Sequence, residues 1–292
     1  MSPAADPAPS RRFIEDLRGR AAAIGARIGF PESDEPRTAQ AIETLEREGL
    51  VIPGRHASGD ATVDLETSLR SLASGDVDGV VAGATNSTAD VIRAGLRVLG
   101  VAPGFDTVSS SFYMVVGSGA DERVLTFTDA GVVPNPTAEQ LAESADAAAT
   151  ARRVIVGDEP RVAFLSYSTM GSANGMSVDL MRAGLQAFRV RRPDVAADGE
   201  LQADAALVAS VGAMKAPGSP VAGCANVLVF PDLASGNIAY KLVERLAGAR
   251  ALGPILQGLG RPLNDLSRGA SPADIVDVAC VTAIMSQGDH SE

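Results

Sequence analysis

Short apolar runs typical of strands alternate along this chain with longer segments of helical periodicity, and this alternation most restricts its fold. Arg27–Phe30 precedes a predicted helix that ends near Glu48, and Arg161–Leu165 precedes another from about Val178 to Arg189. Repeated strand–helix units favour a largely parallel sheet with helices on both faces. The 292 residues suffice for about two domains. We therefore predict an α/β protein.

The rest of the chain extends this pattern. Further strands are predicted at Gly49–Pro53, Val77–Val81, Val108–Val116, Val124–Phe127 and Asn226–Phe230, and further helices at Arg11–Ile24, Val63–Ala73, Gln202–Val208, from Gly236 onward and Asp274–Met285. The glycine-rich residues 117–121 are consistent with a hairpin, and Thr137 and Gln140 have the spacing of a capping box. Residues 1–10, rich in Pro and Ala, are predicted to be a disordered leader.

Charge and composition exclude several classes of partner. The 36 acidic residues outnumber the 25 basic ones and give a net charge of -11, which argues against nucleic acid or an anionic membrane as partner. We find neither an apolar run of about 18 residues nor a secretory signal, so the cytoplasm is the expected location. Two cysteines and two histidines form no disulfide framework and no zinc spacing, so we expect no metal. Cys224 and Cys280 are predicted to be core residues.

A polar turn near the end of the chain is the best candidate for chemistry. An apolar run from Gly253 ends in glycines, after which Ser267 offers a hydroxyl, Arg268 a guanidinium and Asp274 a carboxylate. No histidine is placed to activate Ser267, so the group suits stabilising an oxyanion while a carboxylate takes a proton from a thiol. The alternative is that Asp274 merely favours the start of a helix and Asp265 caps a turn.

Two other features have alternative interpretations. The loop Ser166–Gly175, rich in Gly and Ser, could hold phosphate, but it lacks the Gly-Lys-Ser/Thr ending of a phosphate-binding loop and could be a plain turn. Arg245, on a predicted helix, is by itself more often a solvated side chain than a ligand.

Several motifs in a fixed order carry a family resemblance. They are Asn135–Leu141, Leu165–Thr169, Lys215–Gly223, Val229–Leu233, Gly253–Leu259 and Asn264–Gly269. Together they resemble the phosphate acetyltransferase (phosphotransacetylase) family, within the wider acetyl and butyryl phosphotransferases, from about Asp76 to Gln287. The resemblance implies acetyl transfer between coenzyme A and phosphate, with acetyl phosphate as the other partner and no permanently bound cofactor.

The resemblance also implies residue roles. Asp274 matches the base that deprotonates the coenzyme A thiol, Ser267 the residue that stabilises the transition state, and Arg268 the arginine beside the reacting phosphoryl group. Arg245 matches a contact to a coenzyme A phosphate. The other residues expected to bind substrate are Arg93, Arg37, Ser166, Tyr167, Ser168, Thr169, Lys215 and Asn264.

The implied fold has two three-layer α/β/α domains with a cleft between them, similar to isocitrate and isopropylmalate dehydrogenases. We expect a discontinuous domain of residues 1–104 plus 256–292 and a second domain of residues 105–255, which would supply dimer contacts. The family usually carries tens of residues more between Pro31 and Gly75, so the first domain is shortened here. That difference leaves two alternatives open: a non-catalytic acetyl-CoA sensor or assembly module, and an enzyme that prefers a longer acyl chain such as butyryl.

Overall fold

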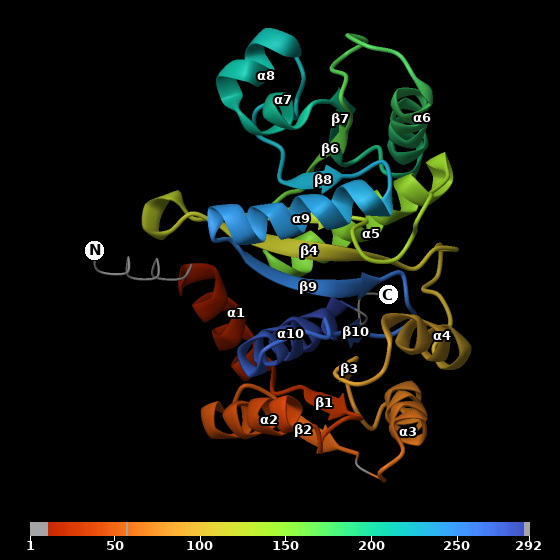
Figure 1. The fold of residues 1–292 in the computed structure, drawn as a ribbon, viewed down its shortest axis with the longest axis vertical. Coiled ribbons are helices and arrows are strands. Elements are labelled where there is room, and N and C mark those ends of the chain that lie inside the picture. Colours follow the sequence, from red (N-terminus) through yellow and green to blue (C-terminus); the bar gives the residue numbers. More distant parts are fainter. Residues whose placement is uncertain (1–10, 57, 289–292) are drawn as a thin grey trace.

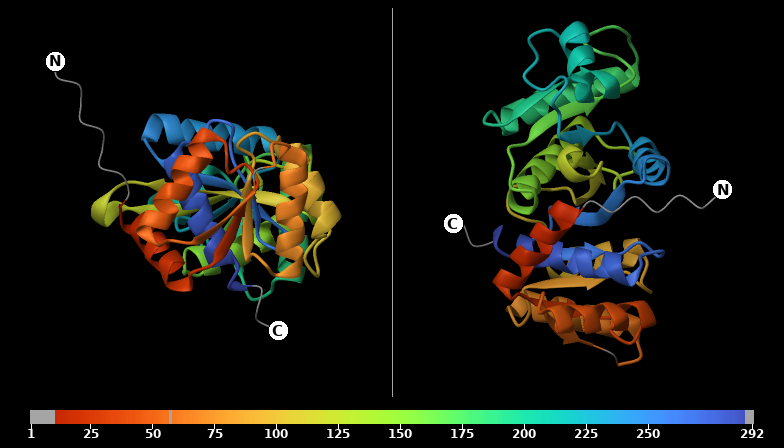
Figure 2. Two further views of the ribbon diagram at one scale, coloured as in Figure 1. Left: turned by 90° about the horizontal axis from the view of Figure 1, so that it is seen from below. Right: turned by 90° about the vertical axis from the view of Figure 1, so that its left-hand side faces the viewer.

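The computed structural model describes residues 11–56 and 58–288 and consists of two α/β units, each built on one sheet. Figure 1 shows the two sheets stacked along the long axis of the molecule, with α1 and α10 between them, and Figure 2 shows the same layers from two further sides. The predicted leader, residues 1–10, and His290 lie outside the described residues.

The smaller sheet has four parallel strands in the order β10-β3-β1-β2. Its strands are β1 (Arg27–Phe30), β2 (Ile52–Arg55), β3 (Gly79–Ala82) and β10 (Leu263–Asp265). Its helices are α1 (Arg11–Ile24), α2 (Pro36–Glu48) and α10 (Pro272–Met285) on one face, with α3 (Ala61–Ser74) and α4 (Thr88–Val98) on the other. The carboxyl ends of its parallel strands therefore meet at one edge of the sheet.

The larger sheet has six strands in the order β7-β6-β8-β5-β4-β9. Its strands are β4 (Ser109–Val116), β5 (Arg123–Thr128), β6 (Arg161–Leu165), β7 (Ala196–Leu201), β8 (Val227–Val229) and β9 (Arg250–Gln257). β4 runs antiparallel to both β5 and β9, and the other four-strand block, β7-β6-β8-β5, is parallel, so the sheet is largely parallel, as predicted. The 3-10 turn Gly119–Asp121 and helices α5 (Ala138–Ile155), α6 (Met176–Arg191), α7 (Ala203–Leu207), α8 (Ala209–Lys215) and α9 (Leu233–Ala247) complete it.

Helix α10 joins the two units because it is apolar nearly all round. Residues 275 to 284 are all buried, against α1, α2, β1 and β3 of the smaller unit and against α5 and β9 of the larger one. A helix that is apolar on every side is stable only where it is covered on every side. Ser271 caps it and Pro272 occupies its first turn, as the sequence predicts.

The predicted α/β class and most elements are confirmed, including the capping box of Thr137 and Gln140. Four details were wrong: β2 lies later than predicted, and β7, α8 and β10 were not predicted as separate elements. Cys280 is buried as predicted, whereas Cys224 is exposed because it lies in the connection before β8 rather than inside the strand. We propose the predicted division, residues 1–104 with 256–292 and residues 105–255, as the two domains.

Candidate functional site

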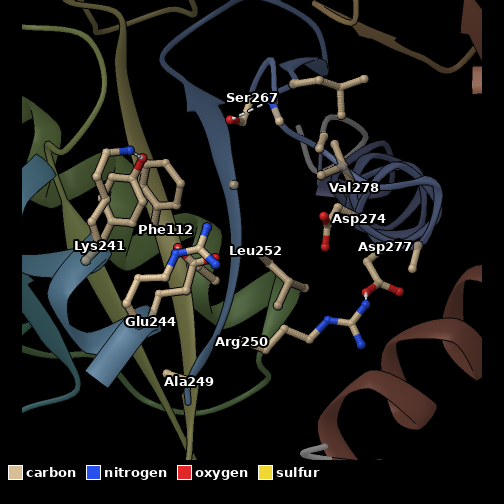
Figure 3. Close-up of a pocket in the computed structure, with 18 of the residues that line it drawn as sticks. Phe112, Lys241, Glu244, Ala249, Arg250, Leu252, Ser267, Asp274, Asp277 and Val278 are labelled. Atoms are coloured by element: carbon tan, nitrogen blue, oxygen red, sulfur yellow. Dashed lines mark hydrogen bonds and ion pairs between the residues drawn. The ribbon is translucent and has the colours of Figure 1, made fainter. Parts of the chain in front are cut away.

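A groove of about 720 Å³ lies between the two units, a size typical of ligand sites. The larger unit supplies Phe112 of β4, Tyr240, Lys241, Glu244 and Arg245 of α9, and Arg250–Gly253 of β9. The smaller unit supplies Leu266, Ser267, Gly269, Ala270, Ala273, Asp274, Asp277 and Val278. Figure 3 shows Ser267 at one end of this groove and Arg250 with Asp277 at the other, with Asp274 on the side of α10 between them.

The turn that carries Ser267 is held firmly although its side chains are exposed. Leu266 donates a backbone hydrogen bond to Ala82 O (2.8 Å), which fixes the end of β10 to β3. Arg37 Nη1 donates to the carbonyl oxygens of Arg268 (2.8 Å) and Ala270 (3.1 Å). Arg37 therefore acts as a brace of the turn.

The Ser267 hydroxyl is available to a ligand. Its Oγ accepts one long hydrogen bond from Gly269 N (3.4 Å), and no acceptor for its proton is present among residues 11–56 and 58–288. Arg268 is also exposed and follows Ser267 directly, although its side chain does not line the groove. The turn can therefore present a hydroxyl donor to an oxygen atom in the groove.

Asp274 caps α10 and also faces the groove. Its Oδ2 accepts hydrogen bonds from Ser271 N and Ser271 Oγ, both 2.8 Å long, which completes a capping box at the start of α10. Within the described part of the chain, its second oxygen, Oδ1, has no hydrogen-bond partner, and the half-buried side chain lines the groove. One oxygen thus anchors the helix while the other can accept a proton.

Asp277 forms the opposite end of the groove with two arginines. It is almost fully buried and pairs with Arg250 and with Arg18 Nη2 (2.9 Å). Burial raises the pKa of Asp277, an effect that Arg250 and Arg18 oppose and that the nearby Asp274 reinforces. Arg250 and Asp277 were not predicted from the sequence. A lone carboxylate within the apolar run of α10 was the available signal, because a buried charge needs a partner.

Helix α9 adds positive charge and aromatic surface to the groove. The side chain of Arg245 is 80% exposed and lies 3.6 Å from Glu244. Phe112 and Tyr240 stack with ring centroids 3.8 Å apart, and Lys241 Nζ lies 4.4 Å from the Tyr240 centroid. Lys241 and Arg245 are therefore the basic groups of this wall, whereas Arg250 is paired with Asp277.

The other residues expected to bind substrate lie outside the groove. Arg93 pairs with Asp90 (2.7 Å) on the exposed side of α4, and Lys215 donates to Gln202 (3.0 Å) and Asp204 (2.8 Å). Asn264 is fully buried and donates to Thr282 Oγ1 (2.8 Å). These residues do not converge on one ligand in this structure.

The loop after β6, which contains Ser166, Tyr167, Ser168 and Thr169, also lies apart from the groove. Ser168 donates to Glu200 Oε1 (2.7 Å), and Arg182 pairs with the same carboxylate (2.8 Å). Burial opposes ionisation of Glu200, but these donors, with Gly171 N, lower its pKa to about 2. The polar groups of this loop are therefore used to hold the loop itself.

The fold is that of a two-domain α/β protein with a groove between its domains. Residues 63–283 match the model of the phosphate acetyl/butaryl transferase family, and the chain belongs to that family. Among the described residues, no helix is long and apolar enough to cross a membrane, and no group of three or more His, Cys, Asp or Glu could hold a metal ion.

Related proteins cover most of the chain. A phosphate acetyltransferase of Clostridium acetobutylicum is 43% identical over 281 residues, which are 93% of this chain and 84% of the relative. One of Paracoccus denitrificans is 41% identical, over 94% of this chain and 99% of the relative. The crystal structure of a phosphotransacetylase from Streptococcus pyogenes matches with a TM-score of 0.87 and 34% identity, over 95% of this chain and 98% of that one.

The match with the Paracoccus protein runs over 315 positions, more than the 292 residues of this chain. That relative therefore contains residues without a counterpart here, which is consistent with the expected shortening of this chain.

Proposed function

We propose that this protein is a phosphate acetyltransferase, which transfers acetyl groups reversibly between coenzyme A and inorganic phosphate. The observation that carries the proposal is that Ser267 and Asp274 of the smaller unit line one groove with the basic residues Lys241, Arg245 and Arg250 of the larger unit. This combines a hydroxyl donor, a proton acceptor and an anion-binding wall. The names of the matching relatives support the same activity.

In the direction of acetyl-CoA synthesis, Asp274 Oδ1 accepts the proton of the coenzyme A thiol. An ordinary thiol has a pKa of about 8.5 and is only a few per cent ionised at neutral pH, so an adjacent base raises the thiolate fraction. The sulfur attacks the carbonyl carbon of acetyl phosphate, and a carbon–sulfur bond forms. The bond between the carbonyl carbon and the oxygen that bridges to phosphorus then breaks, and its electron pair leaves with phosphate.

Ser267 and Arg268 stabilise charge during this step. The Ser267 hydroxyl can donate a hydrogen bond to the acetyl oxygen, which gains negative charge as the sulfur adds. Arg268, next in the chain and exposed, is expected from the family resemblance to lie beside the phosphoryl group. Arg245 and Lys241 would bind phosphates of coenzyme A on the opposite wall, because both are basic and line the groove.

A phosphate-dependent assay tests this function. Thiol release from acetyl-CoA should increase with phosphate concentration and saturate, and acetyl-, propionyl- and butyryl-CoA measured in parallel give the acyl preference. A rate that does not depend on phosphate would contradict the proposal.

A non-catalytic acetyl-CoA sensor is the second candidate, favoured by the residues that the Paracoccus relative has and this chain lacks. Calorimetry that detects acetyl-CoA binding in a protein without turnover would support it.

We also propose a homodimer formed by the larger domain, in the cytoplasm. Ile238, Leu242 and Leu246 of α9 recur every four residues, so they share one helix face, and their exposed fractions are 58%, 52% and 82%. A second copy covering this stripe would remove it from water. Sedimentation should show a dimer that Leu242→Glu weakens.

The remaining resemblance-based residues stay predictions. They are Arg93, Arg37, Ser166, Tyr167, Ser168, Thr169, Lys215 and Asn264.

A further inference from the structure

A buried carboxyl group lies directly beneath the Ser267 turn and has no role in the mechanism above. Asp265 ends β10, two residues before Ser267, and is fully buried. Its Oδ2 accepts a hydrogen bond from Thr88 Oγ1 (2.5 Å), whereas Oδ1 is buried without a hydrogen-bond partner among the described residues. Asp265 therefore does not cap a turn. It connects the strand that leads to Ser267 with the first residue of α4.

The space beside the Asp265 carboxyl group has no room for a side chain on Gly83. Gly83, which follows β3, has a φ of +102°, and a Cβ atom placed there would lie 2.2 Å from Asp265 Oδ1 and 2.8 Å from Leu266 N. A side chain at this position would displace the carboxyl group or the backbone that leads to Ser267. Where β3 and β10 end, the structure therefore accommodates the Asp265 carboxyl group only because residue 83 is a glycine.

A second buried carboxyl group, which follows β1, has a different set of hydrogen bonds. Glu32 is also buried, and its oxygens accept hydrogen bonds from Ala84 N, Thr85 N, Thr85 Oγ1, Asn86 N and Asn86 Nδ2. Both groups act on the segment between β3 and α4, because β3 lies between β1 and β10 in the sheet. Glu32 has a full set of donors, and Asp265 has one oxygen without any.

The neutral acid fits this environment better than the carboxylate. Burial raises the pKa of Asp265 to about 7; Thr88 and Leu266 N oppose the rise, and Glu32 adds to it. Charged groups on the adjoining elements include Arg37 of α2, which donates to Ala84 O (3.1 Å). On α4, Asp90 and Arg93 pair with each other at the surface, and Arg97 pairs with Glu66. Among the residues the structure describes, no cation pairs with Asp265.

We propose that Asp265 is a positioning residue: its neutral carboxyl group fits the space beside Gly83 and Leu266 and so holds the backbone that leads to Ser267, while Thr88 links it to the start of α4. An ionised Oδ1 would have to reach water or move away from Glu32, and either change disturbs the backbone of Leu266 and Ser267. Transfer is then fastest while Asp265 is neutral. This inference rests on the proposed acetyl transfer, because the turn it positions is the one assigned to that reaction.

The first test compares Asp265→Asn with the unchanged protein across pH, at saturating substrates. The ratio of their rates cancels titrations that both proteins share. With a midpoint at about pH 7, the neutral fraction falls about tenfold from pH 6 to pH 8, so the rate of the variant relative to the unchanged protein should rise by about that factor. The KM for coenzyme A should stay unchanged, and Asp106→Asn, at an exposed carboxylate, is the matched control. A constant ratio would overturn the proposal.

Thr88→Val tests the same link without removing the carboxyl group. The Thr88 hydroxyl favours the carboxylate, so its loss should move the fall in rate to higher pH. A merely structural role would lower stability and leave the position of that fall unchanged, and that result would count against the proposal.

A measurement without turnover separates this inference from the proposed function. In protein labelled with ¹³C-carboxyl aspartate, the signal absent from Asp265→Asn should titrate near pH 7. If it titrates but no variant releases thiol with phosphate at any pH, the proposed function fails and the positioning role fails with it. If transfer occurs and this signal does not titrate between pH 6 and 8, only the role of Asp265 is overturned.

Discussion

Replacing Asp265 with Asn should change how the stability of the fold depends on pH. Burial raises the pKa of Asp265 from 3.8 to about 7, so the folded chain binds this proton more tightly than the unfolded chain does. The contribution to stability is therefore complete below about pH 4 and is lost progressively as the pH rises to about 7. A shift of about 3 pKa units corresponds to roughly 4 kcal/mol over the whole range, of which about 3 kcal/mol falls between pH 5 and pH 8.

The assay is urea unfolding at pH 5, 6, 7 and 8, followed by circular dichroism. The free energy of unfolding of the unchanged protein should fall relative to that of Asp265→Asn as the pH rises, because Asn cannot ionise. Asp106→Asn removes an exposed carboxylate and should follow the unchanged protein. Curves for the Asp265→Asn and unchanged proteins that stay parallel within about 0.5 kcal/mol would refute the reasoning, because they would mean that Asp265 binds its proton equally in both states.

Three further changes address the groove and its support. Asp274→Asn should slow transfer by a factor of about 10² to 10⁴ with little change in the calorimetric affinity for coenzyme A, and an unaffected rate would remove Asp274 as the base. Arg250→Met leaves Asp277 with Arg18 alone and should destabilise the fold by about 3 kcal/mol in urea unfolding; an unchanged midpoint would show that the buried pair contributes nothing. Gly83→Ala should lower both the melting temperature and the transfer rate, because its Cβ atom would clash with Asp265 and Leu266; full activity would show that the turn can shift without loss.

The elements that the sequence predicted well are those with strong local signals. Thr137 with Gln140, and Ser271 with Pro272, mark helix starts by side-chain chemistry that needs no distant partner. Strand β7, with the sequence Ala-Ala-Asp-Gly-Glu-Leu, lacks β-branched residues and forms because β6 pairs with it. Strand β10 is only three residues long and depends on β3, about 180 residues earlier in the chain.

The groove residues likewise divide into those with a local sequence signal and those that depend on a distant partner. Ser267 and Asp274 were predicted from a local motif, and the structure places both in one groove. Arg250 was missed because its significance depends on Asp277, which faces it from another element. Asp265 was interpreted as a possible turn cap because nothing in the local sequence shows that Gly83 leaves room for it or that Thr88 reaches it. Contacts between distant segments are what the local pattern could not supply.

The burial of α10 restricts how substrates can enter the groove. This helix carries Asp274 at its exposed first turn and packs along its length against both sheets. A hinge rotation that separated the sheets would expose apolar residues of α10 on one side, at a cost of about 25 cal/mol per Å². We therefore expect coenzyme A to enter the groove without a rotation that separates the two sheets, while Asp274 remains stationary on the helix that both sheets share.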